Sequence, residues 1–320
     1  MLENKINSVL SCYISPLQKL LSRERLVEIS VVGEGQIGFE YADSGYVFET
    51  HPELDKSYWR RLCKVLANLN GLKFSFPKDP FLSVALPGGH RFQAKMGQGV
   101  ESGLDISIRL FRNIDLSFDS FGLSQDLSDD ICHRLKKGMN CLISGGTSSG
   151  KTTFLRHMLN QIPTSKRILT LEDTREIFLP NHKHILHHMV ARNGSSDERN
   201  KAYGDEIDHM MRSRPDIIVL GEVSTSNAFP ILRFLNSGHA GFFSTVHANT
   251  ADLAMSSAIP QNIALSGHSS EGVEGVLRAT LDMVIQLNKV DGKRLVTEIY
   301  FPQENRRIIP NEDNYSLRAA

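Results

Sequence analysis

Residues 145–152 read Gly-Gly-Thr-Ser-Ser-Gly-Lys-Thr and satisfy the pattern G-x-x-x-x-G-K-[ST]. A loop of this kind wraps the phosphates of a nucleotide between a strand and a helix. The apolar run Cys141-Leu142-Ile143 precedes the loop and suits a buried strand, and apolar residues then recur at helical spacing as far as Pro163. The stretch therefore predicts a strand, a phosphate loop and a helix in an α/β domain.

Each constrained position of the loop has a chemical reason. Gly145 and Gly150 allow backbone conformations that a side chain would block, and Lys151 neutralises charge on the β- and γ-phosphates. Thr152 would hold Mg²⁺. We expect the loop to bind ATP or GTP through nine residues: Gly145, Gly146, Thr147, Ser148, Ser149, Gly150, Lys151, Thr152 and Thr153.

Length and composition predict the number of domains, the class of partner and the compartment. A chain of 320 residues predicts two domains of ordinary size, and 36 basic against 36 acidic residues call for neither nucleic acid nor an anionic membrane. The four cysteines include no C-x-x-C pair, which indicates free thiols in a reducing compartment. Without a signal-peptide pattern or an apolar run of about 20 residues, we expect a cytoplasmic protein that can dock on a membrane complex.

Residues 1–112 predict a compact α+β domain. Apolar spacing favours helices at 17–26 and 58–69, and alternation favours strands at 28–31, 36–40, 82–86, 91–95 and 105–110. Residues 113–127 mix Asp, Ser, Asn and Gly with isolated Phe and Leu, which is typical of a linker.

Residues 128–320 change to alternating strands and helices. The runs 168–171, 217–220 and 241–246 are unbroken apolar or β-branched stretches, as buried parallel strands require. The segments between them are long enough for crossover helices. We expect a mainly parallel sheet with helices on both faces and a nucleotide at the carboxyl edge of its strands.

Polar side chains follow three of these strands. Glu172, Glu222 and His247 each come at or just after a strand end. Phosphoryl transfer to water needs a carboxylate to hold a Mg²⁺-bound water, another to orient the attacking water, and a polar group on the γ-phosphate. Singly, a carboxylate here is often a helix cap and a histidine is often structural. Their occurrence together with a phosphate loop favours a hydrolytic site.

Four segments in this order resemble the Walker A, Asp-box, Walker B and His-box of secretion ATPases: 145–153, 171–176, 214–222 and 237–250. The resemblance extends from about residue 17 to about residue 285 and implies a RecA-like P-loop NTPase domain. The wording Glu-Asp-Thr-Arg-Glu and His-Ala-Asn-Thr is most similar to the hexameric traffic ATPases of type IV secretion and conjugation systems, the VirB type. It is less similar to pilus-retraction and type II secretion motors.

The resemblance implies a mechanism and partners. Similar proteins form six-membered rings in which the N-terminal domain closes over the nucleotide and supplies arginines, and the matching residues are Arg91 and Arg109. Guanidinium groups suit this role because they bind phosphate oxygens bidentately. The implied activity is Mg²⁺-dependent ATP hydrolysis that powers substrate translocation or machine and pilus assembly. The implied partners are inner-membrane and cytoplasmic components of a secretion complex, with peripheral attachment to the inner membrane and no sequence-specific nucleic-acid binding.

The chain departs from the family pattern after the Walker B acid. Relatives commonly carry Arg two residues after it, where this chain has Ser224, and Asp216 precedes the strand, which leaves Glu222 as the acid at its end. We assign Glu222 to orienting water and Glu172 to the second carboxylate, which holds Mg²⁺ with Thr152 partly through water. The two carboxylate roles are open to exchange, and Ser224 puts ring communication in question.

The sequence leaves other functions open. A type IV pilus or type II secretion motor is the main alternative, followed by a nucleic-acid helicase, a P-loop kinase and a nucleotide-binding scaffold without turnover. On one strand face, His182, His184 and His188 would resemble a Zn²⁺ site. No Cys or carboxylate is interleaved with them, so we favour an ordinary strand.

Overall fold

The computed structural model describes residues 2–41, 45–75, 77–111, 116–191, 195–239, 241–310 and 318–319. The chain divides into two compact units, 1–113 with 191–193, and 114–190 with 194–320. The predicted linker at 113–127 begins with 113–115, which lie outside the described residues, and 116–127 belong to the second unit. The domain limits expected from the sequence stay a prediction.

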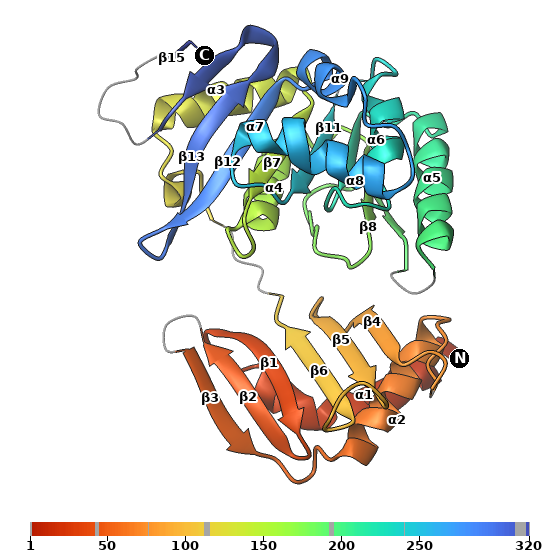
Figure 1. Ribbon diagram of the computed structural model, residues 1–320. Helices are drawn as coiled ribbons and strands as arrows, with labels where there is room; N and C mark the ends of the chain where they lie inside the picture. The colour runs from red at the N-terminus through yellow and green to blue at the C-terminus, as the bar shows by residue number, and fades with distance from the viewer. Residues whose placement is uncertain are drawn as a thin grey trace. The chain divides into compact units, whose positions relative to one another are not determined.

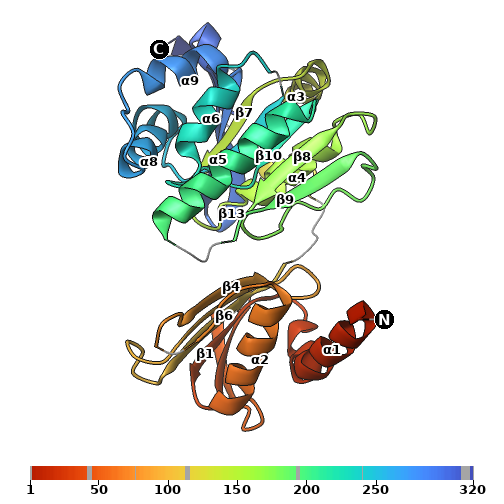
Figure 2. The same cartoon turned by 90° about the vertical axis from the view of Figure 1, so that its right-hand side faces the viewer.

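The first unit is a six-stranded antiparallel sheet in the order β3-β2-β1-β6-β5-β4. Helices α1 and α2 lie on one face of the sheet, as Figure 2 shows. The elements are α1 Leu2–Leu21, β1 Leu26–Gly33, β2 Gln36–Tyr41, β3 Gly45–Thr50, α2 Lys56–Leu69, β4 Phe81–Ala85, β5 Arg91–Met96 and β6 Leu104–Arg109.

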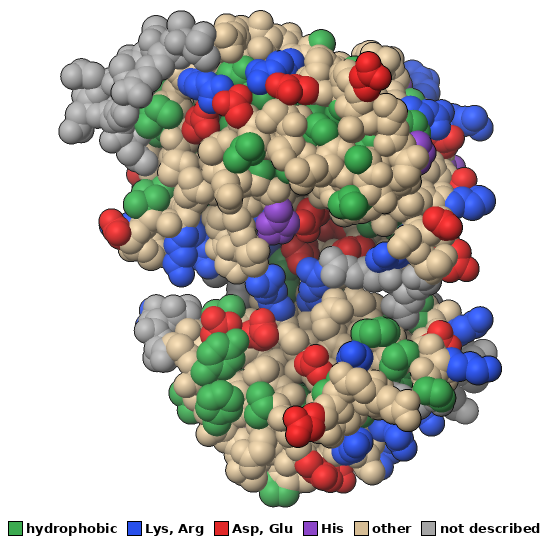
Figure 3. Space-filling model, in the orientation of Figure 1, with side chains coloured by type: hydrophobic (Ala, Val, Ile, Leu, Met, Phe, Trp, Pro, Cys, Tyr) green, Lys and Arg blue, Asp and Glu red, His purple; other side chains and the backbone are tan. Residues whose placement is uncertain are grey.

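Alternation along the strands gives this sheet a buried and an open face. On β5 and β6, Phe92 and Ile108 are fully buried in the same core as Trp59 of α2. The alternate residues along β5 and β6 lie on the open face. At the edge strand β3, apolar side chains are exposed at Tyr46, Val47 and Phe48, where Figure 3 shows hydrophobic groups gathered.

The sequence-based elements of this unit are confirmed with two exceptions. The helix expected at 17–26 is wrong at both ends, because α1 runs from Leu2 to Leu21 and Leu26 opens β1 opposite Tyr41. The burial of Leu26 in a strand outweighs its helical spacing. Strand β3 was not expected, since its side chains are mostly exposed and show no apolar alternation.

The second unit is a nine-stranded sheet in the order β15-β14-β13-β12-β7-β11-β10-β8-β9 (Figure 1). Pairs from β12 through β9 are parallel, and pairs from β12 through β15 are antiparallel. Its strands are β7 Cys141–Gly145, β8 Ile168–Glu172, β9 Ile185–Met189, β10 Ile217–Leu220, β11 Phe242–Val246, β12 Met283–Val290, β13 Lys293–Phe301, β14 Arg306–Ile308 and β15 Arg318–Ala319.

Helices cover both faces of this sheet. Ile143 of β7 belongs to the core beneath α3 and α4, whereas its neighbour Leu142 belongs to the core beneath the other helices. The helical elements are η1 Asp119–Phe121, α3 Gln125–Lys137, α4 Lys151–Asn160, α5 Ser196–Arg212, α6 Ala228–Leu235, α7 Ala251–Leu253, η2 Ala254–Ala258, α8 Ile259–Leu265, α9 Val273–Thr280 and η3 Pro302–Glu304.

The predicted fold class, a mainly parallel α/β domain after a smaller α+β domain, is confirmed. Among the described residues, we find no helix whose length and apolar character would let it span a membrane.

Candidate active site

The phosphate loop connects the end of β7 to the start of α4. A Cβ at Gly145 would lie 2.5 Å from the carbonyl oxygen of Leu287 and 2.5 Å from Ser149 Oγ, so only glycine fits. Gly150 caps α4 with a φ of +94°. Ser148 also has a left-handed backbone, with a φ of +59°. The loop therefore turns tightly and leads into a helix N-terminus, whose free N–H groups favour an anion.

Lys151 folds back over this loop. Its Nζ donates to the carbonyl oxygens of Gly145 at 2.9 Å and Gly146 at 2.8 Å, and it lies 3.3 Å from Nδ1 of His247. The residue is only 8% exposed. An ammonium held by carbonyl oxygens in this way is already at the loop and can exchange them for phosphate oxygens.

His247 and Glu222 continue the contact across neighbouring strand ends. His247 follows β11, Glu222 follows β10, and Nε2 of the imidazole lies 3.0 Å from Oε1 of the carboxylate. Because β7, β11 and β10 are adjacent and parallel, their carboxyl ends meet at one edge. The structure thus brings Lys151, His247 and Glu222 into one chain of contacts.

Glu172 ends β8, the next strand along the same edge. Its Oε1 accepts from the backbone N–H groups of Glu176 at 2.9 Å and Ile177 at 3.1 Å. Its Oε2 is buried and has no hydrogen-bond partner within the described residues. Burial raises the pKa of this carboxyl to about 7, against the lowering effect of the two N–H groups. The side chain is therefore poised between its charged and neutral forms near neutral pH.

These oxygens fit a magnesium ion. Mg²⁺ takes oxygen ligands and commonly uses one or two carboxylates together with phosphates. The unpartnered Oε2 of Glu172 is such an oxygen, and the hydroxyl of Thr152 stands in the first turn of α4, where this loop motif provides its metal ligand. A bound ion would neutralise charge on the phosphates.

Asn227 and Thr245 brace the turn that carries Glu222. Asn227, 1% exposed, donates through Nδ2 to the carbonyl of Glu222 at 2.9 Å and accepts from the N–H of Ser224 at 2.8 Å. Thr245 Oγ1 donates to the carbonyl of Gly221 at 2.8 Å. Sequence reasoning gave neither residue a role, although Thr245 lies within the His-box segment. For Asn227, the available signal was an amide five residues past the Walker B acid, which belongs to no recognised motif.

The two arginines singled out in the first domain stand side by side. Arg91 of β5 is the register partner of Arg109 of β6, and Arg109 in turn is opposite Glu28 of β1. All three belong to the open face of the first sheet, because their strand neighbours point into the core. Two guanidinium groups therefore stand on adjacent strands of this unit, with the carboxylate residue Glu28 on the next strand.

The histidines considered for zinc have separate partners. His182 contacts the carbonyl of Ile162 at 3.1 Å, His184 lies 3.2 Å from Nη1 of Arg167, and His188 contacts Glu206 at 2.9 Å. His187 lies 2.8 Å from Thr170 Oγ1, and burial lowers the pKa of its imidazole to about 4. Within the described ranges, no group of three or more His, Cys, Asp or Glu side chains is arranged to hold a metal ion.

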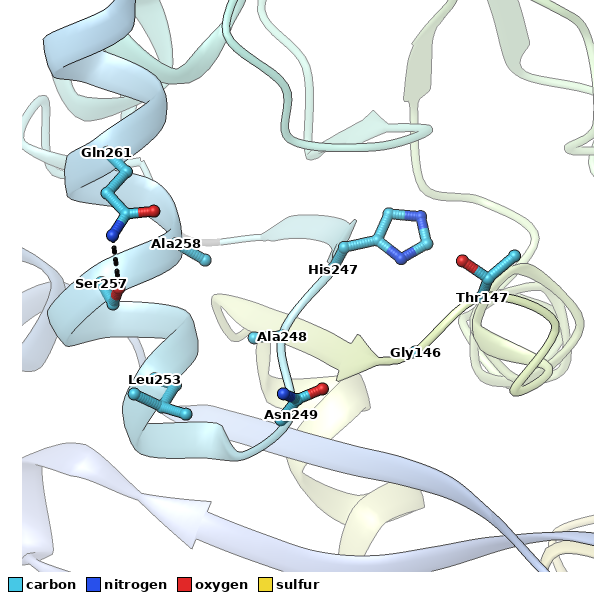
Figure 4. Close-up of a pocket in the computed structure, with 9 residues that line it drawn as sticks. All are labelled: Gly146, Thr147, His247, Ala248, Asn249, Leu253, Ser257, Ala258 and Gln261. Atoms are coloured by element: carbon cyan, nitrogen blue, oxygen red, sulfur yellow. Dashed lines mark hydrogen bonds between the residues drawn. The ribbon is translucent and has the colours of Figure 1, made fainter.

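A pocket of about 420 Å³ opens beside the phosphate loop. Figure 4 shows the ring of His247 extending toward Thr147 of the loop, with Ser257 and Gln261 on the helix opposite. A second pocket of about 330 Å³ shares His247 and Gln261 and reaches Glu222 and Ser224. The histidine therefore borders both pockets, between the loop and the Walker B turn.

A phosphate loop with acids and a histidine at neighbouring strand ends defines the class of P-loop nucleotide hydrolases. The chain matches the family model described as "Type II/IV secretion system protein" over residues 40–286, and it belongs to that family. It is 27% identical to the type IV secretion system protein VirB11 of Bartonella quintana, with 96% of this chain and 97% of the relative covered.

One further sequence relative and one solved structure are also similar to this chain. The chain is 30% identical to the conjugal transfer protein TrbB of Rhizobium radiobacter, over 69% of this chain and 67% of the relative. The crystal structure of the Legionella pneumophila ATPase DotB is similar in fold, with a TM-score of 0.63, 16% identity, and coverage of 92% and 81% of the two chains. The protein is therefore a homologue of type IV secretion and conjugation ATPases, and the family implies nucleotide binding and ATPase activity.

Proposed function

We propose that this protein is a Mg²⁺-dependent ATPase that powers substrate translocation or machine assembly in a bacterial type IV secretion or conjugation system. The contact chain from Lys151 through His247 to Glu222 carries the proposal. It joins a phosphate-binding cation, a candidate γ-phosphate sensor and a candidate base at one edge of the sheet. A scaffold that only bound nucleotide would not need this arrangement.

The two carboxylates take different roles in this proposal. Glu222 orients the attacking water, because its side chain is accessible at 42% and is joined to His247. Glu172 holds Mg²⁺ with Thr152, because a buried carboxylate oxygen without a partner gains most from a cation. The N–H groups of Glu176 and Ile177 keep the other oxygen of Glu172 in place.

The ring and its partners are also part of the proposal. The chain works as a homohexamer, in which the domain 1–112 moves on the linker 113–127 against the ATPase domain 128–320. Arg91 and Arg109 reach the phosphates as this domain closes, as in similar proteins. The ring contacts inner-membrane and cytoplasmic components of the secretion complex and lies at the cytoplasmic side of the inner membrane. The type IV secretion and conjugation relatives support the assignment to a secretion complex.

Substitution of the loop lysine tests the site. Lys151→Ala should lower ATP turnover about a hundredfold or more, because it removes the ammonium group that the loop holds beside the β- and γ-phosphates, while the protein stays folded. Lys136→Ala removes an exposed lysine from α3 and should turn over ATP at the wild-type rate. Wild-type hydrolysis in Lys151→Ala would refute the proposed site.

The proposed ring is tested by measuring the size and the ATP hydrolysis of the same sample of wild-type protein. Light scattering coupled to size-exclusion chromatography, with and without ATP and Mg²⁺, should show a species of six chains that hydrolyses ATP. Hydrolysis by a species that remains monomeric in both conditions would refute the ring and leave the active site standing. Omitting Mg²⁺ with EDTA should abolish turnover.

A further inference from the structure

The hairpin of β12 and β13 runs beside the phosphate loop. The carbonyl of Leu287 on β12 makes the close approach that excludes a side chain at Gly145. Past the hairpin turn, Arg294 of β13 donates from Nε to the carbonyl oxygen of Ser148 at 3.1 Å. The hairpin therefore contacts the loop at its beginning and at its middle.

Arg294 contacts the part of the loop with the least common backbone. Ser148 is a non-glycine residue in the left-handed region, a backbone conformation that persists only where its surroundings hold it. A Cβ at Gly150 would lie 3.0 Å from Cδ of Arg294 and 3.3 Å from Cε1 of Phe121. The stem of Arg294 thus covers Gly150 while its Nε–H fixes Ser148.

A bond to the Ser148 carbonyl also sets the direction of the next N–H. In a trans peptide, the C=O of Ser148 and the N–H of Ser149 point in opposite directions. The carbonyl faces Arg294 outside the loop, and the Ser149 N–H faces inward, where it donates to the Gly146 carbonyl at 3.4 Å. That long bond is one a phosphate oxygen can replace.

The same hairpin also supports the His-box. Gln286 of β12, 2% exposed, donates from Nε2 to the carbonyls of Ala248 at 3.3 Å and Asn249 at 3.1 Å, directly after His247. One pair of strands therefore contacts both the phosphate loop and the segment that carries the candidate γ-phosphate sensor.

We propose that Arg294 is a positioning residue for the phosphate loop: it holds Ser148 in its left-handed conformation and keeps the Ser149 N–H directed at the nucleotide. The inference rests on the proposed function, since it assumes that the loop binds ATP. Arg294 acts through the loop and not on the reacting atoms, so it sets nucleotide affinity more than the rate of hydrolysis.

The test combines nucleotide binding with kinetics. We compare wild type, Arg294→Ala and Arg294→Lys for fluorescent ATP-analogue binding and for the kcat and KM of ATP hydrolysis. Arg294→Ala should raise Kd and KM about tenfold, as loss of a charge-assisted hydrogen bond predicts, with kcat within about twofold of wild type. Arg294→Lys keeps a donor without the planar Nε–H and should fall between the two.

Lys293→Ala is the matched control. It removes the same charge one residue away on β13, from an exposed side chain on the other face of the strand. Its Kd and KM should equal those of wild type. Equal effects in Lys293→Ala and Arg294→Ala would mean that only net charge matters and would overturn the proposal.

Loop dynamics provide a readout independent of turnover. Amide hydrogen exchange in nucleotide-free protein should speed up at 145–150 in both Arg294 variants, with the interior of α4 unchanged. Unchanged exchange together with a wild-type Kd in Arg294→Ala would overturn the inference and leave the proposed function intact. Failure of wild type itself to bind the analogue would refute the proposed function instead.

Discussion

The two sheets of this molecule display polar side chains in different ways. In the antiparallel sheet of the first unit, Arg91 and Arg109 stand on the open face, as register partners on adjacent strands. In the mainly parallel sheet of the second unit, both faces are covered by helices, and the polar residues stand at the carboxyl ends of the strands. The first sheet presents its polar residues on one face, and the second presents them along the carboxyl ends of its strands.

This difference follows from strand direction. Alternate residues of an antiparallel strand reach a face that can stay open, so arginines at paired positions of adjacent strands are neighbours on that face. A parallel sheet buries both faces, and only its edge is free for chemistry, where helix N-termini and loops also meet. Burial is deepest there for Glu172, whose carboxyl pKa rises to about 7.

The largest expected effect is at the edge of the parallel sheet. Glu222→Gln should lower kcat about a hundredfold or more while ATP-analogue affinity stays near wild type, because the amide keeps the shape of the side chain but loses the charge that orients water. Glu206→Gln alters a similar His–carboxylate pair, with His188, away from the phosphate loop. Equal rates of ATP hydrolysis in both variants would contradict the proposed role of Glu222 in orienting water.

A second effect separates a buried edge carboxylate from an exposed one. The Glu172 carboxyl has a folded-state pKa of about 7 against an ordinary value of 4.5, so its contribution to stability is present below pH 4.5 and is lost as pH rises to about 7. Between pH 5.5 and 8.5, this loss amounts to about 2 kcal/mol.

Urea unfolding of nucleotide-free protein in EDTA measures this effect. Wild type should lose about 2 kcal/mol of unfolding free energy relative to Glu172→Gln across that range. Glu271→Gln, at an exposed position, should follow wild type. Parallel pH profiles for wild type and Glu172→Gln would contradict the raised pKa.

The smallest effect concerns the open face of the antiparallel sheet. Arg91→Ala and Arg109→Ala should each lower kcat/KM for ATP about tenfold, because each removes a guanidinium proposed to bind the phosphates. Lys95→Ala removes a charge from the same face of β5, four residues from Arg91, and should stay within about twofold of wild type. Wild-type kinetics in both arginine variants would confine nucleotide binding to the second unit.

The sequence predicted the second unit better than the first. Buried parallel strands appear as unbroken apolar runs, so β8, β10 and β11 were located from the sequence within one or two residues. Strand β3 was missed because its exposed side chains give no alternation, and the end of α1 was misplaced because Leu26 packs in a strand through contacts distant in sequence.

The same distinction applies to the candidate site. Lys151, Glu172, Glu222 and His247 stand in local motifs and were named from sequence. Asn227 and Arg294 have no motif, because their roles come from hydrogen bonds to the backbone at Glu222 and Ser148. A side chain that braces a carbonyl can be of several types and can come from any nearby segment, so its position has no sequence signature.

The sequence by itself determined the phosphate loop, the order of the strand-end residues and the fold class. These depend on local chemistry: glycine where a side chain is excluded, a lysine for phosphate, and apolar runs for buried strands. Only the tertiary structure decided that His247 lies between Lys151 and Glu222, that Glu172 is buried with an unsatisfied oxygen, and that Arg294 holds the loop. Those facts depend on strand order and on burial, which bring together residues distant in the chain, such as Lys151 and His247 at a separation of 96.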